Sequence, residues 1–331
     1  MNSPASGDSA LLEHANRSIA VGSKSFAAAA RLFEPATRRS AVMLYAWCRH
    51  CDDVIDGQQA GHGAVPLSRA QAEQRLLQLK VQTRAIYAGA RLQDPAFAAF
   101  RQVVVAHGIP EAHAMAHLAG FEMDVSERRY LCIDDTLQYC YHVAGVVGLM
   151  MARVMGTQDE PTLDRACDLG LAFQLTNIAR DIIEDAQVGR CYLPELWLAE
   201  LGVPPDQLAE PQFRPAIAVL AKRLVDLAEP YYLSAQAGIT ALPWRSAWAV
   251  ATAAQVYRQI GVEVVAAGDK AWDQRVSTSK AQKIGAICVG LWRATTDRSR
   301  HWPARDPALW RRPEAAPARD AAHAAAPANA P

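Results

Sequence analysis

Hydrophobic residues recur three and four positions apart along most of the chain, which is the period of an amphipathic α-helix. Alternating stretches rich in β-branched residues, which would predict strands, are hard to find. Pro and Gly clusters separate the periodic segments. The pattern predicts helices over Ser25–Phe33, Arg38–Ile55, Ser68–Ala88, Pro95–His107, Glu111–Asp124, Asp134–Val154, Pro161–Ile183, Pro194–Glu200, Phe213–Leu242, Ala247–Ala267 and Lys280–Ala294.

These segments predict one all-α helical bundle over residues 1–300, with no linker inside it. The end of the chain differs. Residues 303–331 contain six prolines, many alanines and scattered charges. Such a composition is typical of a disordered extension, so we expect no catalytic residue there.

A first polar stripe lies in the segment that ends in Asp52-Asp53-Val-Ile-Asp56. Each helical residue turns by about 100°, so Tyr45, Arg49, Asp52 and Asp56 fall within about 60° of arc. The other faces of this segment are apolar, which indicates a largely buried helix. Two carboxylates one turn apart then need a positive partner, and Arg49 supplies part of it.

A second polar stripe lies in the segment Gln174-Leu-Thr-Asn177-Ile-Ala-Arg180-Asp181-Ile-Ile-Glu184-Asp185. Gln174, Asn177, Asp181 and Asp185 share an arc of about 80°. Its flanks are apolar nearly all round, which is typical of a helix inside a bundle. The stripe must therefore face a cavity or another polar stripe.

Either stripe alone could be an ordinary solvated face, because carboxylates four residues apart are common on helices. Two such stripes in the most apolar segments of one chain weaken that interpretation. Carboxylate and amide oxygens suit Mg²⁺ or Mn²⁺, and Mg²⁺ held by few carboxylates usually binds substrate phosphates as well. The pattern indicates a diphosphate held by divalent ions beside an apolar cavity.

Charge and composition narrow the function classes. Lys plus Arg equals Asp plus Glu at 34 each, which argues against a nucleic-acid-binding protein. No stretch reads as a secretion signal, and Val143–Ala152 is too short to span a bilayer. The seven cysteines form no metal-binding pattern and are expected to be free thiols of a reducing compartment. We therefore expect a cytoplasmic protein.

Three strings carry a specific resemblance. They are Leu44-Tyr-Ala-Trp-Cys-Arg-His-Cys-Asp-Asp-Val-Ile-Asp56, Tyr139-Cys-Tyr-His-Val-Ala-Gly-Val-Val-Gly148 and Gln174-Leu-Thr-Asn-Ile-Ala-Arg-Asp181. They resemble the squalene and phytoene synthase family, most closely its bacterial phytoene synthases, and the likeness covers about Leu11 to Arg298. The resemblance implies an isoprenoid-synthase bundle with a central cavity. It also implies head-to-head condensation of two geranylgeranyl diphosphates, through prephytoene diphosphate, to phytoene and two diphosphates. That is the first committed step of carotenoid biosynthesis.

The resemblance assigns roles to particular residues. As ligands of Mg²⁺ or Mn²⁺ it implies Asp52, Asp56, Asn177, Asp181 and Asp185. As catalytic residues it implies Asp52, Asp56, Asp181, Asp185, Tyr139, Tyr192 and Tyr257, the tyrosines facing the cavity. Against the substrate it places Ser23, Ser25, Tyr45, Arg49, Val143, Ala144, Gln174, Asn177, Arg180 and Arg275.

Simpler interpretations stay open for several of these residues. Ser23 or Ser25 could only cap a helix, and the three tyrosines could only pack in the core. Arg275 could lie on a solvated face. The small residues from Val143 to Gly148 could serve close helix packing, a cavity wall that leaves room for prenyl chains, or both.

Two other functions stay open beside phytoene synthesis. One is a squalene or dehydrosqualene synthase that uses farnesyl diphosphate, and the other is a non-catalytic helical assembly factor of the same fold. Intact acidic motifs argue against the second, because uncompensated charges in a cavity destabilise a scaffold. No nicotinamide-binding fingerprint is present, and we expect no use of NADPH. We also expect loose association with the inner face of the membrane and hand-off of the product to a phytoene desaturase.

Overall fold

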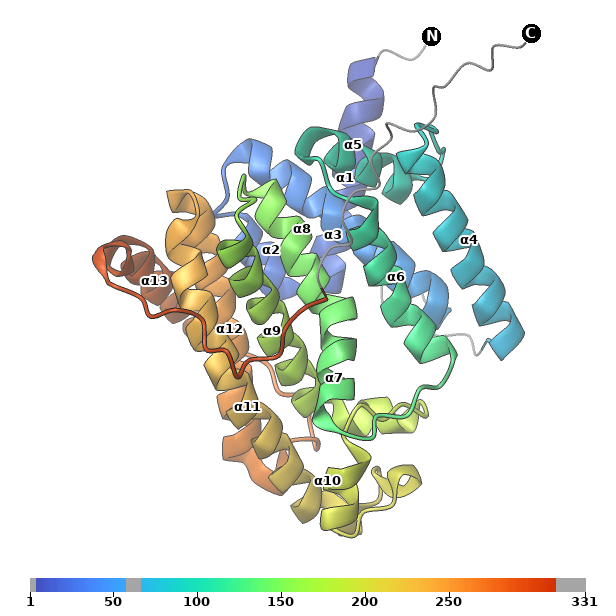
Figure 1. Cartoon of the computed structure of the whole chain (residues 1–331), viewed down its shortest axis with the longest axis vertical. Coiled ribbons are helices and arrows are strands. Elements are labelled where there is room, and N and C mark those ends of the chain that lie inside the picture. The colour runs from blue at the N-terminus through green and yellow to red at the C-terminus, as the bar shows by residue number, and fades with distance from the viewer. Residues whose placement is uncertain (1–3, 58–66, 314–331) are drawn as a thin grey trace, which may run out of the picture.

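Helix α9 (Glu160–Gln187) forms the centre of the larger part of the hydrophobic core (Figure 1). Its buried residues occupy nearly every face of the helix, as its sequence predicts. The helices packed around it are α7 (Ile133–Cys140), η1 (Tyr141–Gly145), α8 (Val146–Val154), α11 (Arg214–Ala241) and α12 (Trp244–Ala267). Leu171, Ala172, Leu175 and Ala179 of α9 are completely buried among them.

Helix α3 (Pro35–Asp56) forms the centre of the second part of the core. Pro35 opens the helix, where its missing N–H is not needed, and Gly57 ends it with a φ of 64°. Trp47 stacks on Phe100 at 3.9 Å between ring centroids. The helices around α3 are α1 (Pro4–Gly22), α4 (Arg69–Tyr87), α5 (Pro95–His107) and α6 (Glu111–Val125).

The computed structural model describes residues 4–57 and 67–313, and these ranges contain helices and no strand. The expected fold class is therefore confirmed for that part of the chain. The remaining helices are α2 (Lys24–Ala30), α10 (Glu195–Glu200) and α13 (Lys280–Thr296), with short 3₁₀ turns at Pro205–Gln207, Pro211–Phe213, Gly268–Lys270 and Asp297–Ser299. Within the described ranges, no helix has the length and hydropathy needed to cross a bilayer.

One helix was missed and one helix prediction needs correction. The sequence pattern did not predict α1, because only a narrow apolar row that includes Ala15 and Ile19 is buried along it. The single helix expected over Asp134–Val154 is three consecutive segments, with the π-helical η1 in the middle. A π-helical turn re-aims side chains locally and frequently occurs at functional sites.

Small residues let η1 and α8 pack closely on α9. A Cβ atom added to Gly148 would lie 2.3 Å from the carbonyl oxygen of Ala166, so no larger residue fits there. A Cβ added to Gly170 of α9 would lie 2.4 Å from the carbonyl oxygen of Ala144. Close helix packing is therefore one role of this small-residue segment.

The expectation of a disordered extension beginning at Pro303 is wrong for residues 303–313. This segment crosses the bundle (Figure 1), and ion pairs between its arginines and carboxylates of α9 hold it in place. Arg305 donates two hydrogen bonds, of 2.8 and 2.7 Å, to the carboxylate of the completely buried Asp168. Arg312 donates to Asp164 at 2.6 Å, and Leu309 is buried. The rest of the expected extension, residues 314–331, lies outside the described residues.

Candidate active site

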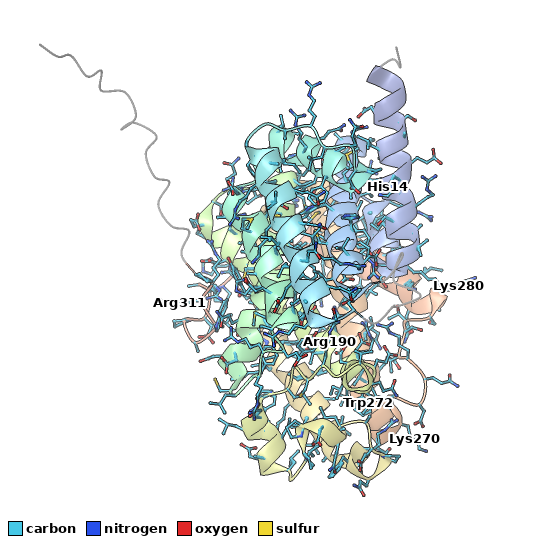
Figure 2. All side chains as sticks on the ribbon, turned by 90° about the vertical axis from the view of Figure 1, so that its right-hand side faces the viewer. His14, Arg190, Lys270, Trp272, Lys280 and Arg311 are labelled. Atoms are coloured by element: carbon cyan, nitrogen blue, oxygen red, sulfur yellow. The ribbon has the colours of Figure 1, made fainter. Side chains whose placement is uncertain are left out.

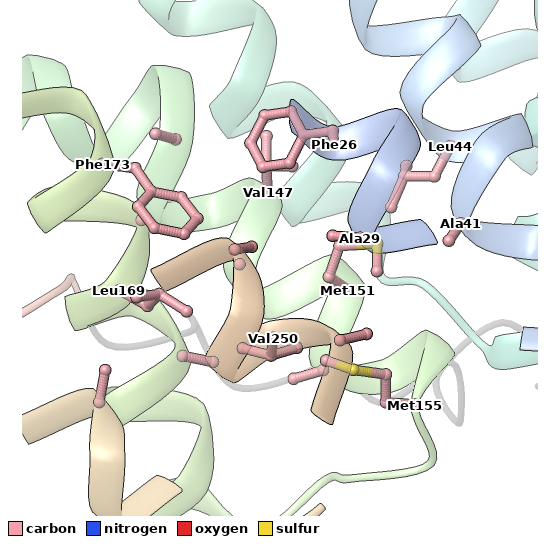
Figure 3. A pocket seen from close by; sticks show the side chains of 18 of the residues that line it. Phe26, Ala29, Ala41, Leu44, Val147, Met151, Met155, Leu169, Phe173 and Val250 are labelled. Atoms are coloured by element: carbon pink, nitrogen blue, oxygen red, sulfur yellow. The ribbon is translucent and has the colours of Figure 1, made fainter. Parts of the chain in front are cut away.

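An apolar cavity of about 360 Å³ lies between the two parts of the core. Its lining comes from α1, α2, α3, α6, η1, α8, α9, α11 and α12 (Figure 3). Side chains such as Phe26, Val147, Met151, Leu169 and Phe173 make nearly all of its wall hydrophobic. Such a wall excludes water and suits a hydrocarbon chain.

The two predicted stripes meet this cavity at their N-terminal ends. Tyr45 of α3 and Gln174 and Asn177 of α9 line it, and the Asn177 Nδ2 donates to the Gln174 Oε1 at 3.3 Å. The carboxylates of both stripes follow one to three turns further along α3 and α9. The acidic residues therefore lie next to one end of the cavity, on two of the helices that line it.

Both acidic groups lie near helix C-termini. Asp52 and Asp56 occupy the last turns of α3, and Asp181 and Asp185 the last turns of α9. The helix dipole is negative at this end and disfavours carboxylates there. These residues therefore do not stabilise their own helices, and arginines compensate them instead.

Arginines contact the carboxylates of the α3 stripe. Arg49 approaches Asp52 at 2.9 Å and Asp53 at 2.8 Å. Arg190, from the loop after α9, donates to Asp56 at 2.5 Å. The predicted pairing within the stripe is confirmed, while the contact of Arg190 was not predicted.

Arginines also contact the α9 stripe. Arg180, on its flank, donates to the neighbouring Asp181 at 2.7 and 2.5 Å. Arg275 reaches Asp181 from the loop before α13 at 3.0 Å, and its Nε lies 3.6 Å from Glu184. Arg275 is more than half exposed but faces the acidic stripe, so the simpler interpretation of a purely solvated side chain is wrong.

Asp124 and Arg190 join the two stripes, and sequence reasoning missed both. Asp124, near the end of α6, accepts hydrogen bonds from the hydroxyls of Tyr192 at 2.9 Å and Tyr139 at 3.3 Å. Arg190 lies near the centre of the molecule's outline (Figure 2), and its charge partly offsets the rise that burial causes in the pKa values of Asp124, Asp52 and Asp185. One guanidinium thus acts on carboxylates from three helices.

Burial, and after it the crowding of like charges, raises the pKa values of these carboxylates. Burial and then the charge of Asp56 raise the pKa of Asp52 to about 7. Burial and then the charge of Asp181 raise the pKa of Asp185 to about 7, and burial raises that of Asp124 to about 6. The ionised forms are therefore destabilised in the protein alone, as expected of a site prepared for further positive charge.

Aromatic rings form the junction between the cavity and the polar residues. Phe26 stacks on Tyr257 at 5.2 Å, and Phe173 stacks on Tyr257 at 4.4 Å. Tyr257 also shares a hydrogen bond with Ser23, which weakens the rise of the Tyr257 pKa caused by burial. Tyr45 lies edge-on to Phe26 at 6.3 Å. Phe26 and Phe173 had not been predicted as site residues.

The segment before α2 brings its serines to this junction. The hydroxyl of Ser23 caps α2 by accepting from the Phe26 N–H at 3.2 Å, so the simple capping role is present. Ser25 lies half-buried in the first turn of the same helix. A Cβ added to Gly22 would lie 2.4 Å from the Tyr45 Oη, so the start of α2 lies directly against the first stripe.

The expected position of all three tyrosines needs correction, because none of them lines the apolar cavity. Tyr257 stacks on the wall residues Phe26 and Phe173 instead. Tyr139 and Tyr192 do not line the apolar cavity but stack on each other at 4.4 Å beside Asp124. Tyr192 instead lines a neighbouring depression of mixed polar and apolar residues, together with Asp56 and Arg190. The loop that carries Tyr192 after α9 explains the difference, because it brings the ring to α6 and α7. Val143 and Ala144 do line the apolar cavity, so their segment serves both packing and the wall.

Comparison with known proteins decides the family. The sequence profile described as squalene/phytoene synthase matches residues 19–282. The chain is 58% identical over 313 residues to the 15-cis-phytoene synthase of Pantoea ananas, covering 95% of this chain and all of that protein. The chain belongs to the squalene/phytoene synthase family. It is also 60% identical over 294 residues to the 15-cis-phytoene synthase of Enterobacter agglomerans, covering 88% of this chain and 99% of that protein.

Solved structures of the family share the fold. A dehydrosqualene synthase crystallised with a ligand superimposes with a TM-score of 0.77 at 27% identity, covering 87% of this chain and 98% of that one. A squalene synthase from Alicyclobacillus acidocaldarius gives a TM-score of 0.68 at 20% identity, covering 80% of this chain and 97% of that one. The all-α isoprenoid-synthase fold is thus confirmed.

The donor groups of the site fit a divalent ion of the kind the family's motifs imply. The Asn177 Oδ1 is buried and accepts no hydrogen bond, although a buried carbonyl oxygen ordinarily has a partner. The nearby carboxylates are hard oxygen donors. Within the described ranges, however, no three carboxylate, thiol or imidazole groups already converge on one point. Arginines hold the carboxylates instead, so metal binding would compete with these ion pairs.

Magnesium is expected to stabilise the protein more strongly at about pH 8 than at about pH 6. The raised pKa values of Asp52, Asp124 and Asp185 mean that the folded state holds extra protons, so their contribution to stability falls as the pH rises from about 4 to about 7. A bound cation replaces those protons. Thermal unfolding with and without MgCl₂ at both pH values measures the effect.

The matched comparison for this experiment is Asp52→Asn/Asp185→Asn against Glu184→Gln. Glu184 lies on α9 beside the stripe and is about half exposed. The double variant should lose the magnesium-dependent shift in melting temperature, and Glu184→Gln should keep it. An equal shift in both variants would place the ion elsewhere.

Asp124→Asn is expected to lower kcat by about 10-fold to 100-fold. This is the usual effect of changing a residue that does not bind the metal itself but orients the groups around it through hydrogen bonds. The amide keeps the size of the side chain but removes the charge that faces Arg190 and weakens the hydrogen bonds from both tyrosines. Steady-state kinetics measures the change. Glu122→Gln on the same helix, an exposed residue paired with Lys80, is the control. Unchanged kcat in Asp124→Asn would make this network purely structural.

Proposed function

We propose that the protein is a phytoene synthase. It would join two molecules of geranylgeranyl diphosphate head to head and release phytoene, two diphosphates and two protons. The single observation that carries the proposal is the attachment of two acidic, arginine-bearing stripes to one end of an apolar cavity, in a chain 58% identical to a curated 15-cis-phytoene synthase. Prenyl diphosphates have the same division into a charged head and an apolar chain.

The head groups would bind at the polar end. Arg49, Arg180 and Arg275 carry planar guanidinium groups that can each contact two diphosphate oxygens. Ser23 and Ser25 add hydroxyls at the start of α2. Tyr45, Gln174 and Asn177 lie where the head group meets the first carbons of the chain. Positive charge at the leaving group lowers the barrier to breaking the C–O bond.

The residues proposed to hold Mg²⁺ or Mn²⁺ are Asp52, Asp56, Asn177, Asp181 and Asp185. The support is their oxygen donor set and the unpartnered Asn177 Oδ1. The ions would neutralise the charge of the diphosphates as these leave. Binding would also release the arginines from their carboxylate partners, so that their guanidinium groups could turn to the substrate.

The apolar cavity would protect the reactive chain. Loss of the first diphosphate leaves an allylic cation. The double bond of the second chain attacks this cation, and loss of a first proton closes the cyclopropane ring of prephytoene diphosphate. Loss of the second diphosphate, rearrangement and loss of a second proton then give phytoene. Phe26 and Phe173 present aromatic faces near the head-group end, where they can stabilise a cation, and the hydrophobic wall excludes water that would trap it.

The association with the inner face of the membrane, the cytoplasmic location and the hand-off to a phytoene desaturase belong to this proposal. Their support is chemical, because the substrate carries a long hydrocarbon chain and the product is a hydrocarbon, and both partition into bilayers. NADPH is not needed, because the last step is loss of a proton rather than reduction of the cation.

A competition assay tests the proposed substrate. Purified protein receives equal amounts of geranylgeranyl and farnesyl diphosphate with Mg²⁺, and mass spectrometry measures the hydrocarbons, with and without NADPH. We expect mainly the forty-carbon phytoene, in an amount that NADPH does not change. Mainly thirty-carbon product would move the protein to the squalene or dehydrosqualene synthases. No hydrocarbon from folded protein would favour the non-catalytic assembly factor.

A further inference from the structure

Helix α13 has an uncharged, apolar outer face. The helix lies at the edge of the molecule and packs on α12 (Figure 1). Ile284 and Trp292 are each 63% exposed, Leu291 is 37% exposed, and Cys288 is exposed. These four residues, called here the α13 face, fall within about 100° of arc. Surface helices normally place charged residues in this position.

A pair of tryptophans on α12 continues the apolar surface. Trp244, at the start of α12, is 43% exposed, and its ring lies 5.5 Å from that of Trp248. Trp248 donates from Nε1 to the carbonyl oxygen of Ile287 at 2.9 Å, which fixes it against the middle of α13. Tryptophan is the side chain most typical of the boundary between lipid and water.

The charge of α13 and the turn after it is mostly positive. Residues 280–300 carry a net charge of +4, although the whole chain is neutral. The basic residues are Lys280, Lys283, Arg293, Arg298 and Arg300, and Asp297 is the single acidic one. In Figure 2, Lys280 lies at the edge of the molecule. An apolar helix face with basic flanks is complementary to an anionic lipid surface. A second copy of the chain on this face would bring like charges together.

The face also lies beside the apolar cavity. Helix α12 lines the cavity with Ala249, Val250 and Ala253 and packs on α13 with another side, where a Cβ added to Gly290 would lie 2.9 Å from the Thr252 nitrogen. Arg298 donates to the carbonyl oxygen of Leu242, another cavity-lining residue, at 2.6 Å. One helix thus separates the cavity from the α13 face.

We propose that the α13 face docks the protein on an anionic lipid bilayer, with Ile284 and Trp292 inserted among the lipids and the basic residues beside the headgroups. The inference rests on the proposed function in one respect, that prenyl substrate and hydrocarbon product pass between bilayer and cavity. Docking on this side brings α12 and the cavity next to the membrane. The sequence predicted membrane association but no surface for it, and the proposal assigns this association to α13.

Vesicle sedimentation of the full-length protein tests the proposal. The vesicles contain phosphatidylcholine alone or mixed with phosphatidylglycerol. Wild-type protein should bind the anionic vesicles and bind the neutral ones much more weakly. Ile284→Gln/Trp292→Gln should weaken binding to anionic vesicles by about tenfold or more, because two large apolar side chains no longer insert. Leu77→Gln/Val81→Gln on α4 is the matched control, with exposures of 60% and 56%, and should bind as the wild type does.

A fluorescent probe locates the contact. Cys288 lies on the α13 face and is exposed, whereas the other six cysteines are buried or partly buried. An environment-sensitive dye can therefore be attached to Cys288. The labelled protein should show a blue shift with anionic vesicles and quenching by lipids with spin-labelled acyl chains. Cys288→Ser treated with the same dye gives the background from the other thiols.

The outcomes separate the docking face from the proposed function. Every variant is also assayed with substrate in detergent, where the α13 variant should keep wild-type activity. No vesicle binding by the wild type, equal binding by the α13 variant, or an unquenched dye would overturn the docking face even if the enzyme is active. A dimer that dissociates in Ile284→Gln/Trp292→Gln would contradict it by making the face a self-association surface. Vesicle binding without any hydrocarbon product would instead overturn the proposed function alone.

Discussion

Asp181→Asn is expected to fold normally and to lower the rate of hydrocarbon formation by about 10³-fold or more. Asp181 lies at the centre of the α9 stripe, where Arg180 and Arg275 both contact it. The amide keeps the size of the side chain but removes the charge that would attract a divalent ion. Asp52→Asn should have a similar effect on the other stripe. Steady-state turnover with geranylgeranyl diphosphate and circular dichroism together make the measurement.

The matched control for Asp181→Asn is Glu184→Gln. It removes a carboxylate from the same turn of α9, also close to Arg275 but about half exposed. Its turnover should stay within about threefold of the wild type, as expected for an exposed ion pair. Retained turnover in Asp181→Asn would remove this residue from the proposed metal site. Equal losses in both variants would show that only the total negative charge matters.

Arg305→Met is expected to destabilise the fold by about 3–5 kcal/mol, because it leaves a buried carboxylate without its cation. Asp168 is completely buried, and besides Arg305 it has a hydrogen bond of 2.6 Å from the Ser234 hydroxyl. Methionine retains much of the apolar stem, so the loss reports the missing charge. Urea unfolding followed by fluorescence measures the change in the free energy of unfolding.

Two further variants interpret the Arg305→Met result. Adding Asp168→Asn to it should recover part of the lost stability, because the buried charge is then absent. Arg129→Met breaks an ion pair with Glu195 whose arginine is 80% exposed, and should leave the free energy of unfolding nearly unchanged. If Arg305→Met were as mild as Arg129→Met, the segment 303–313 would contribute little to the fold.

The helical bundle and the two stripes could be predicted from sequence because their signals are local. Asp52 and Asp56, or Asn177, Asp181 and Asp185, follow one another at the spacing of helix turns, so their shared face can be derived without the rest of the fold. The structure places Tyr45, Gln174 and Asn177 on one cavity, as two facing stripes require.

The missed features depend on partners far apart in the chain. Asp124 is a single acidic residue near the end of an apolar helix, and no spacing connects it with Tyr192, 68 residues later. Arg305 and Asp168 are separated by 137 residues, so the order of the segment 303–313 could not be read from its Pro and Ala content. Asp168 alone gave a usable signal, because a carboxylate within a helix that is buried nearly all round requires a cation.

The most direct test of the account is the stoichiometry of the reaction. Purified protein is incubated with geranylgeranyl diphosphate and Mg²⁺ without NADPH, and phytoene and free diphosphate are measured together. The account predicts two diphosphates per forty-carbon phytoene, and loss of both products when a chelator removes the metal or Asp181 is replaced by asparagine. Release of diphosphate with a prenyl alcohol as the product, or formation of phytoene in the presence of the chelator, would contradict it.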